Sequence, residues 1–431
     1  MRSANGLIIG APRSGSGKTL VTLGLLAALR KRGLSVAPAK TGPDYIDAAI
    51  LSRVAGTPAI NLDPWAMGHT SLQTRAYVHS VGMMLLLVEG VMGLFDGAAD
   101  GKGSTGDLAA ALRLPVVLVV DAEKQGQSIA ALVSGFANFR QDVEVAGIIV
   151  NRVATTRHEN MLRAALQPLG IPILGVLPRR EGLVLPDRHL GLVLPDEVAA
   201  FDAIVETAAE AVENFIDINR LVALSAPLPT GDPKPERRLT PLGQRIAIAR
   251  DEAFCFIYQH LLEDWQAQGA SLSFFSPLAD ESPKTDSDAV FLPGGYPELH
   301  GERLQAASNF RDGLIIAAHR SNALIYGECG GYMMLGQSLT DRSGRAFRMT
   351  GLLPISTDIS RPRRTLGYRR LTNLGALPWP RDLLGHEFHY SSGGDATPLF
   401  AATDALGTEL PAMGAVVGRV MGSYAHVIDA A

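Results

Sequence analysis

Two segments of this sequence place reactive side chains among glycines, directly after an apolar run and before a helical pattern. The first is GAPRSGSGKT (10–19), whose order of strand, glycine loop and helix is that of a phosphate-binding P-loop. Glycines let backbone N–H groups curve around phosphate oxygens, and the helix N-terminus adds a positive dipole end. The residues assigned to nucleotide binding in this loop are Gly15, Ser16, Gly17, Lys18 and Thr19. Lys18 would reach the β- and γ-phosphates, and the Thr19 hydroxyl would bind Mg²⁺.

The loop departs from the P-loop template at Pro12, where the template has glycine. A glycine-rich turn with an incidental Lys-Thr pair is the alternative interpretation. The apolar run, the loop, the Lys-Thr pair and the helical pattern of 19–33 coincide, and this coincidence favours the nucleotide site.

Acidic side chains follow the next two strand-like runs, in TGPDYIDAAI (41–50) and VEGVMGLFDG (88–97). Ligands of parallel sheets bind beyond the carboxyl ends of the strands, where a carboxylate can hold Mg²⁺ beside a triphosphate. We predict Asp44 and Glu89 as metal ligands together with Thr19, and Asp47 and Asp96 as further residues of the site. Helix N-capping is the alternative for the aspartates, whereas Glu89 would be costly to bury without a partner.

Two other polar residues end strand-like runs. Lys40 is predicted to meet an anionic substrate, and Asn151 is predicted to read the adenine edge of the nucleotide. Helix capping or simple surface exposure is an equally good alternative for each of them.

The second glycine-flanked segment is ALIYGECGGYMMLG (323–336), which has the nucleophile-elbow pattern with cysteine in place of serine. The sharp turn needs small neighbours, and a helix N-terminus favours the thiolate of Cys329. The other cysteine, Cys255, is interpreted as a core residue in the middle of a strand.

A nucleophilic cysteine needs a base and donors for an oxyanion. His426 in GSYAHV (422–427) is the predicted base, with a structural histidine as the alternative. FLPGGYPE (291–298) places Gly294 and Gly295 after a strand, and the predicted oxyanion donors are the backbone N–H groups of Gly295 and Gly330. The spacing in GHEFHYS (385–391) is not that of a zinc site.

Alternating apolar runs and helical patterns must position these residues. The strand-like runs of the first half are 6–10, 35–40, 84–90, 115–122, 145–153 and 172–178. Continuous apolar strands alternating with helices predict a parallel sheet covered on both faces. Those of the second half are 245–251, 272–277, 288–295, 314–319 and 323–331, with a helix around 253–267. The fold class is therefore α/β with two doubly wound domains.

The boundary between the two domains is expected at SAPLPTGDPKPERRLTPLG (225–243), which holds five prolines. The predicted domains are 1–224 and 244–431. Hydrophobic residues make up 47% of the chain, charged residues 19%, and the net charge is −4. This composition indicates a packed protein and gives no sign of a nucleic-acid or membrane partner. Two cysteines suggest no disulfide framework, so a reducing, cytoplasmic setting is expected.

The cysteine elbow, PGGYPE and GSYAHV together resemble the class I glutamine amidotransferase domain, which has a flavodoxin-like fold. The N-terminal motifs resemble the dethiobiotin-synthetase-like P-loop family. Their fusion in this order, with TGPDYID, VEGVMGLFDG and GHEFHYS, resembles the cobyrinic or hydrogenobyrinic acid a,c-diamide synthases over nearly the whole chain.

The resemblance implies a two-site amidoligase with ATP, glutamine and a corrinoid polycarboxylate as substrates and Mg²⁺ as cofactor. A homodimer is the candidate assembly. Glutamine would be hydrolysed through a Cys329 thioester, and ATP would activate a carboxylate as an acyl phosphate for attack by ammonia. By analogy with the family, the c-acetate would be amidated before the a-acetate. Residues expected to meet the substrate are Lys40, Tyr45, Asp47, Asp96, Arg369, Arg370 and His386.

Five arginines in RPRRTLGYRR (361–370) fit a polycarboxylate independently of the resemblance, because arginine forks match carboxylates. A solvated basic hairpin is the alternative. Class I glutaminases carry His-x-Glu, but Ile428 stands at the Glu position here, so the third catalytic residue stays open, with Asp429 as a weak candidate.

Three other functions compete with this interpretation. A partition-type P-loop ATPase would carry a signature lysine where this chain has Arg13. Cobyric acid synthase, which amidates other corrin carboxylates, shares both domains. A non-catalytic glutamine-binding regulator would bind glutamine without turnover. The sequence also leaves open whether the substrate already holds cobalt, with a slight preference for the metal-free macrocycle.

Overall fold

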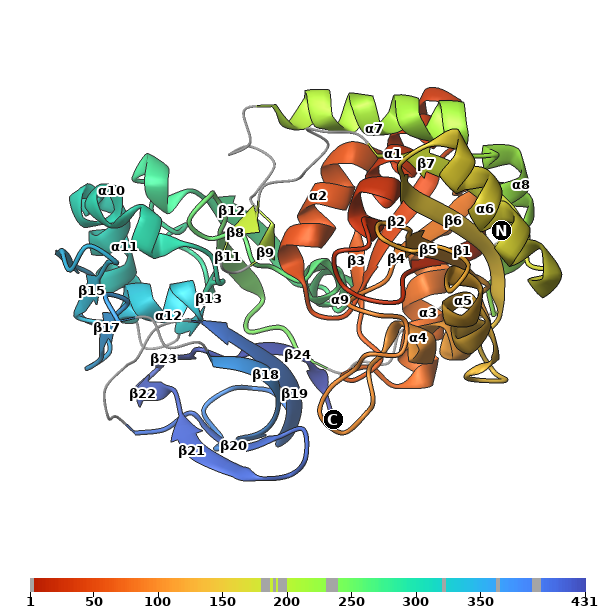
Figure 1. The fold of residues 1–431 in the computed structure, drawn as a ribbon. Coiled ribbons are helices and arrows are strands. Elements are labelled where there is room, and N and C mark those ends of the chain that lie inside the picture. Colours follow the sequence, from red (N-terminus) through yellow and green to blue (C-terminus); the bar gives the residue numbers. More distant parts are fainter. Residues whose placement is uncertain are drawn as a thin grey trace. The chain divides into compact units, whose positions relative to one another are not determined.

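The computed structural model describes residues 4–179, 187–188, 191–192, 200–229, 239–319, 323–361, 365–389 and 397–431. The chain forms two compact units, Met1–Pro235 and Glu236–Ala431, which divide within the expected linker (Figure 1). No helix in the described part of the chain is both long enough and apolar enough to cross a bilayer.

The first unit is an α/β layer structure built on one main sheet, with β8 and β9 forming a separate two-stranded sheet. Its strands are β1 Asn5–Gly10, β2 Val36–Thr41, β3 Ile60–Leu62, β4 Leu85–Glu89, β5 Val116–Asp121, β6 Val145–Val153, β7 Ile173–Pro178, β8 Asp187–Arg188, β9 Gly191–Leu192 and β10 Ala226–Pro227. Its helices are α1 Lys18–Lys31, α2 Tyr45–Ala55, α3 His69–His79, α4 Thr105–Leu112, α5 Ile129–Asn138, α6 Thr156–Leu166, α7 Phe201–Phe215 and α8 Ile218–Ala223.

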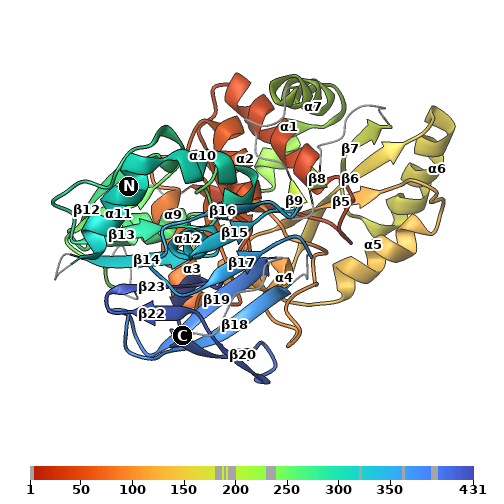
Figure 2. The same cartoon turned by 90° about the vertical axis from the view of Figure 1, so that its left-hand side faces the viewer.

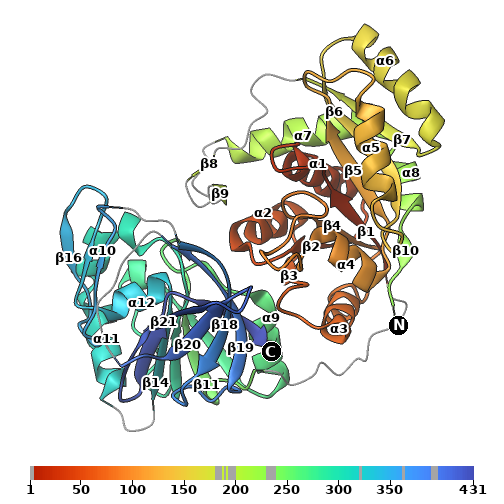
Figure 3. The same ribbon diagram turned by 60° about the horizontal axis from the view of Figure 1, so that its bottom comes forward.

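The order of the main strands is β3-β2-β4-β1-β5-β6-β7, all parallel. Helices α1, α2 and α7 lie along one face of the sheet, and α3, α4 and α5 lie along the other (Figure 3). The strands β2, β4 and β5 are buried along their whole length, as continuous apolar strands between two helical layers should be. Because β1, β2 and β4 are neighbours, the P-loop, Lys40 and Glu89 meet at one edge of the sheet.

The second unit contains a mainly parallel sheet, a separate antiparallel one and a small three-stranded sheet (Figure 2). Its strands are β11 Arg245–Ala249, β12 Ser271–Phe275, β13 Ala289–Leu292, β14 Leu324–Glu328, β15 Ser338–Thr340, β16 Ala346–Arg348, β17 Ser356–Asp358, β18 Thr365–Asn373, β19 Asp382–His389, β20 Phe400–Asp404, β21 Glu409–Met413, β22 Ala415–Val417, β23 Val420–Ser423 and β24 His426–Ala430. Its helices are α9 Gln259–Ala267, α10 Gly301–Ala306, α11 Ser308–Ala318 and α12 Gly330–Leu335.

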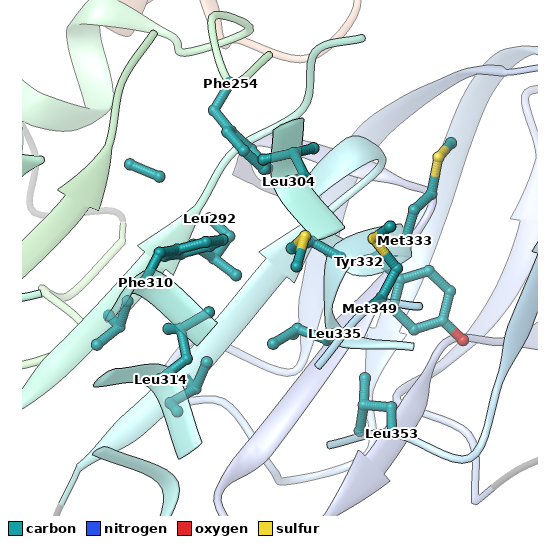
Figure 4. Packing of buried hydrophobic residues seen from close by; sticks show 14 of the residues in the cluster. Phe254, Leu292, Leu304, Phe310, Leu314, Tyr332, Met333, Leu335, Met349 and Leu353 are labelled. Carbon is teal, nitrogen blue, oxygen red and sulfur yellow. The ribbon is translucent and has the colours of Figure 1, made fainter. Parts of the chain in front are cut away.

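The larger sheet of this unit has the order β12-β11-β13-β14-β23-β22, and the antiparallel sheet has the order β21-β20-β18-β19-β24. Strand β23 leads directly into β24, so the two sheets are joined where His426 lies. The short helix α12 is buried from end to end, and Figure 4 shows Met333 and Leu335 among Leu314, Met349 and Leu353 of the core. This packing fixes the helix that follows Cys329.

Several expected elements differ from the structure. Residues 314–319, expected as a strand, lie at the end of α11, because Phe310, Leu314 and Ala317 repeat at helical spacing and form its buried face. The helix expected around 253–267 begins only at Gln259. The expected linker begins with β10, which pairs antiparallel with β1. The antiparallel sheet of the second unit was not anticipated, and most of the near-repeat at 182–197 lies outside the described residues.

Candidate active sites

The phosphate loop connects β1 to α1 and is shaped by two glycines in left-handed conformation. Gly15 has a φ of 78° and Gly17 a φ of 88°, values that side-chain-bearing residues rarely adopt. A Cβ atom on Gly17 would lie 2.2 Å from Nδ2 of Asn151. That amide donates to the Ser16 carbonyl at 2.9 Å, so Asn151 braces the loop rather than facing open space. The expected contact of Asn151 with adenine therefore gains no support from its position.

A second brace of the loop was missed by the sequence analysis. Asp121, at the end of β5, is buried and accepts from Nη1 of Arg152 at 2.8 Å. The same Arg152 nitrogen donates to the Gly15 carbonyl at 2.8 Å, and Arg13 reaches Asp121 at 3.3 Å. An acid that ends a buried parallel strand is the sequence signal that could have identified Asp121.

Glu89 ends β4 with no exposed surface and lies against the P-loop helix. Its Oε1 accepts a hydrogen bond from the Thr19 hydroxyl at 2.5 Å and lies 3.2 Å from Nζ of Lys40. Its Oε2 is buried and meets no hydrogen-bond donor among the described residues. A buried carboxylate oxygen with an open coordination position, next to a P-loop threonine, fits a divalent cation. The described residues contain no cluster of three or more His, Cys, Asp or Glu side chains suited to a metal.

Lys40 is almost completely buried and has three protein acceptors. Its ammonium forms ion pairs with Asp47 and Glu89 and donates to the Gly90 carbonyl at 3.2 Å. Burial lowers the pKa of Lys40, but the carboxylates of Asp47 and Glu89 outweigh it and raise the pKa above its usual value. Lys40 and Asp47 thus form an internal ion pair in this structure, and their contact with substrate stays a prediction.

Asp44 caps helix α2, which is the alternative that the sequence analysis left open. Its Oδ1 accepts from the backbone N–H groups of Ile46 at 2.9 Å and Asp47 at 3.1 Å. Burial and the neighbouring Asp47 raise the pKa of Asp44 to about 7. Tyr45 begins the same helix, next to this cap. The raised pKa does not exclude Asp44 as a metal ligand, because a cation at the site would favour its ionised form. Its role as a ligand stays a prediction.

The remaining expected residues of this site differ in setting. Asp96 is exposed, and its Oδ2 accepts from the backbone of Gly93 at 3.0 Å within its own loop. Lys18 begins α1, and burial together with the nearby Lys40 lowers its pKa. A lowered lysine pKa is expected in a pocket that binds an anionic ligand, because burial and neighbouring positive charges disfavour the ammonium form.

Cys329 lies at a sharp turn between β14 and α12. Its φ of 47° and ψ of −106° place it outside the ordinary regions for a residue with a side chain. A Cβ on Gly331 would lie 1.9 Å from the Leu292 carbonyl oxygen, and one on Gly327 would lie 2.8 Å from the Gly331 backbone. The glycines are therefore required by close backbone approach, and the strained turn holds the sulfur at the N-terminus of α12, as the elbow pattern predicts.

His426 begins β24 and meets the cysteine from the neighbouring strand. Only 2% of its surface is exposed, and its side chain hydrogen-bonds to Cys329. Its Nδ1 lies 3.7 Å from Oε2 of Glu328. Burial lowers the pKa of His426, but Cys329 and Glu328 outweigh it and raise the pKa to about 10. The imidazolium form of His426 is thus favoured near neutral pH.

Two glycine segments converge on the cysteine. A Cβ on Gly294 would lie 2.4 Å from Cε1 of His426 and 3.2 Å from Cβ of Cys329. A Cβ on Gly330 would lie 3.0 Å from the backbone nitrogen of Gly295. The backbones of Gly295 and Gly330 are therefore adjacent at the cysteine, which is the arrangement that a pair of oxyanion donors requires.

The arginine segment divides into a buried and an exposed residue. Arg369 is buried, and its Nε donates to Glu387 at 2.6 Å, so this guanidinium has a protein partner. Arg370, next along β18, is exposed. Of the other arginines of the segment, Arg363 and Arg364 lie outside the described residues. The buried pair is a feature of the fold, and Arg370 is the better candidate to meet a substrate carboxylate.

The settings of His386 and Cys255 depend on neighbours from other segments of the second unit. His386 pairs with His426 across β19 and β24, and burial followed by the charge of His426 lowers its pKa to about 3. It is therefore a neutral, half-buried neighbour of His426, and its contact with substrate stays a prediction. Cys255 is half-buried, lies outside the regular strands, and donates a thiol hydrogen bond to the Glu252 carbonyl. The interpretation as a mid-strand core residue was therefore wrong. The apolar run EAFCFIY instead forms a loop with bridge pairs that backs Gly294.

Comparison with known proteins identifies both halves of the chain. Residues 7–193 match the CobQ/CobB/MinD/ParA nucleotide binding domain, and residues 245–431 match the CobB/CobQ-like glutamine amidotransferase domain. The chain is 54% identical to a hydrogenobyrinate a,c-diamide synthase of Brucella suis biovar 1 (strain 1330), over 98% of both chains. It is 50% identical to the enzyme of that name from Rhizobium meliloti (strain 1021), over 99% of both, and 46% identical to that of Rhodobacter capsulatus, over 98% of both.

The two matched domains account for the two glycine-flanked loops, each in the half where its chemistry is expected. The identity extends over nearly the whole length of each relative, so the order of the domains is shared as well as their presence. The chain belongs to the family of hydrogenobyrinate a,c-diamide synthases.

Proposed function

We propose that this chain amidates the a- and c-acetate carboxylates of hydrogenobyrinic acid, with glutamine as nitrogen donor and ATP as energy source. The observation that carries the proposal is the presence of two separate reactive sites in one chain. One is a P-loop beside a buried carboxylate with an open oxygen, and the other is a strained cysteine with a histidine and two converging glycines. Near full-length similarity to enzymes of this name supports the choice of substrate.

In the glutaminase site, the Cys329 thiolate would attack the side-chain amide of glutamine. The oxyanion would accept hydrogen bonds from the backbone N–H groups of Gly295 and Gly330. The protonated His426 would give its proton to the leaving ammonia, which leaves a glutamyl thioester on the sulfur. A water molecule would then attack the thioester while His426 takes a proton from that water. This step releases glutamate and restores the thiolate.

In the P-loop site, an acetate oxygen of the macrocycle would attack the γ-phosphorus of ATP and displace ADP. Ammonia would then attack the acyl carbon and expel phosphate, so one ATP is consumed for each amide formed. The activation is needed because a carboxylate is a poor electrophile without a leaving group. Lys18 and the loop N–H groups would hold the phosphates, and the Asp121–Arg152 brace would keep the loop in shape.

Thr19 and Glu89 are the residues that would hold Mg²⁺, with Asp44 as a further candidate. Bound there with the triphosphate, the ion would supply positive charge to the phosphate oxygens. Lys40 would keep Glu89 oriented through its contact with Oε1, which leaves Oε2 for the cation.

A mass-spectrometric assay tests the proposed function. The purified chain is given ATP, Mg²⁺ and glutamine, with hydrogenobyrinic acid in one tube and cobyrinic acid in another. Two amidations of hydrogenobyrinic acid are expected. Two amidations confined to cobyrinic acid would change the substrate, and ATP hydrolysis without amidation of either would contradict the proposal and favour the switch ATPase.

Glu89→Gln is expected to lower amidation about 100-fold with either glutamine or ammonia, because the neutral amide is a weaker ligand for a divalent cation. The loss should be partly recovered at higher Mg²⁺ concentration, and glutaminase activity should persist. Initial rates across a Mg²⁺ titration measure this. Glu213→Gln, which removes an exposed partner of Arg32 in the same unit, is the matched control and should behave as the unmodified protein. An unchanged Mg²⁺ dependence would remove Glu89 from the metal site.

Arg370→Glu is expected to raise the KM for the macrocycle several-fold while glutaminase activity stays unchanged, because a carboxylate replaces an exposed cation near a polyanionic substrate. The effect should shrink at high salt. Arg381→Glu, at another exposed position of the same unit, is the control. Equal KM values for the two variants would assign Arg370 to the solvated surface.

A further inference from the structure

We propose that Glu328, the residue directly before the nucleophile, is the carboxylate that orients His426 and stabilises its protonated form. The set at the glutaminase site would then be Cys329, His426 and Glu328, with the acid supplied by the nucleophile's own strand. This inference rests on the proposed glutaminase function of that site, and it fills the position that Ile428 leaves open.

The two oxygens of Glu328 face different partners. Oε1 accepts from the Tyr326 hydroxyl at 2.9 Å and from the Val427 backbone N–H at 3.1 Å. Oε2 lies 3.7 Å from Nδ1 of His426. Only 2% of the Glu328 surface is exposed, so the carboxylate is held by neutral donors on one side and directed at the imidazole on the other. A buried carboxylate with this arrangement needs a positive partner, and His426 is in that position.

The surroundings of Glu328 are rigid. Tyr326 is fully buried, stacked on Phe291 with ring centroids 5.8 Å apart and edge-on to Trp379 at 5.2 Å. Strands β14 and β23 pair in parallel, with Glu328 opposite Ser423, and the backbone N–H of Cys329 donates to the Ser423 carbonyl at 2.8 Å. The acid, the nucleophile and the turn leading to the histidine are therefore fixed in one hydrogen-bonded frame.

This geometry gives Glu328 a chemical role through the histidine. A proton on Nδ1 directed at the carboxylate leaves Nε2 to exchange a proton with the sulfur and with the leaving ammonia. Glu328, 3.7 Å from Nδ1, would stabilise the imidazolium that forms when the thiol gives its proton to His426. A separation of 3.7 Å is longer than a hydrogen bond, and such contacts commonly shorten when substrate binds. Glu328 is thus a positioning residue and touches no substrate.

Other charged groups near His426 do not supply this carboxylate. His386 faces it from β19, and its lowered pKa keeps it neutral. The buried Glu387 on the same strand is paired with Arg369 and His389. Asp429, the acid of β24 itself, uses Oδ1 to accept from the Ala430 backbone at 2.8 Å. Glu328 is the described carboxylate for which an ion pair with His426 is observed.

The test compares Glu328→Gln with Asp429→Asn in the full chain. The glutamine side chain keeps an acceptor for Tyr326 and Val427 but removes the negative charge. Asp429→Asn neutralises a different buried acid, which lies on β24. Three rates are measured for each variant: glutaminase turnover, amidation with ammonia, and alkylation of Cys329 by iodoacetamide from pH 5 to 9. Mass spectrometry assigns the alkylated residue, because Cys255 also carries a thiol.

For Glu328→Gln, glutaminase kcat is expected to fall about 100-fold with little change in KM. Alkylation of Cys329 at pH 7 should slow about 10-fold, because loss of the carboxylate lowers the pKa of His426 and so weakens the imidazolium that stabilises the attacking sulfur. Ammonia-dependent amidation should persist, and Asp429→Asn should retain the original alkylation profile.

An unchanged alkylation profile in a folded Glu328→Gln protein would overturn the proposal. The same shift in both variants would also overturn it, because the effect would then follow from any buried acid. Failure of the proposed function is a separate outcome, since the unmodified chain would then not hydrolyse glutamine, while its alkylation profile would still report on Glu328.

Discussion

Cys329→Ala is expected to abolish glutamine-dependent amidation, with a loss of at least about 1,000-fold, while amidation with free ammonia continues at nearly the original rate. The sulfur would form the thioester in the glutaminase site, and no other described thiol lies there, since Cys255 is in a separate loop on the Glu252 carbonyl. Ammonia from solution bypasses this step and can attack the acyl phosphate directly. Product formation with each nitrogen source, followed by mass spectrometry, measures the difference.

Cys255→Ala is the matched control, and it should leave both nitrogen sources usable. Cys329 also belongs to the buried core of its unit, and its removal is expected to lower the free energy of unfolding by only about 1 kcal/mol, since alanine leaves a small cavity. Thermal unfolding of both variants checks this. Loss of ammonia-dependent amidation in a folded Cys329→Ala protein would mean that the thiol has a role outside glutamine hydrolysis.

Lys18→Ala is expected to stop amidation from both glutamine and ammonia, with a loss of more than about 100-fold, because the ammonium that would neutralise the β- and γ-phosphates is removed. The surroundings support this role: Lys18 lies at the start of α1, and burial and Lys40 lower its pKa. ATP consumption and amide formation measured together separate a defect in activation from a defect in ammonia supply.

Lys31→Ala is the control for the lost charge, because Lys31 is on the same helix and forms an exposed ion pair with Glu206. It should amidate normally, since exposed pairs contribute little to stability. Glutamine hydrolysis should persist in Lys18→Ala. Normal ATP-dependent amidation in that variant would remove the P-loop from the mechanism.

Local sequence determined the two reactive loops. The spacing of Gly15, Gly17, Lys18 and Thr19 is a requirement of the loop itself, since left-handed backbone and a helix start follow from these residues alone. The same is true of Gly327 and Gly331 around Cys329, where any side chain would collide with backbone. Continuous apolar runs were sufficient to predict a covered parallel sheet in each half, because such strands can only be buried on both faces.

Tertiary structure decided which side chains meet at these loops. Glu328 contacts His426 and Val427 only because β14 pairs with β23 and the chain then turns into β24, about a hundred residues later. In the related pattern the acid follows the histidine, and Asp429 was the candidate after His426. Asn151 and Lys40 were identified as strand-end residues, but whether each faces a ligand or a protein partner depends on neighbours from other strands.

For residues 314–319, local sequence also failed to determine the secondary structure. A short apolar run fits a strand or one face of a helix equally well, and the choice depends on the surface it packs against. The antiparallel sheet was missed because its strands are half-buried and their register is set by pairing between distant segments. The sequence by itself therefore determined the reactive groups and the turns that present them. The partners of those groups were decided by strand pairing, since contacts between segments far apart in the chain leave no local pattern.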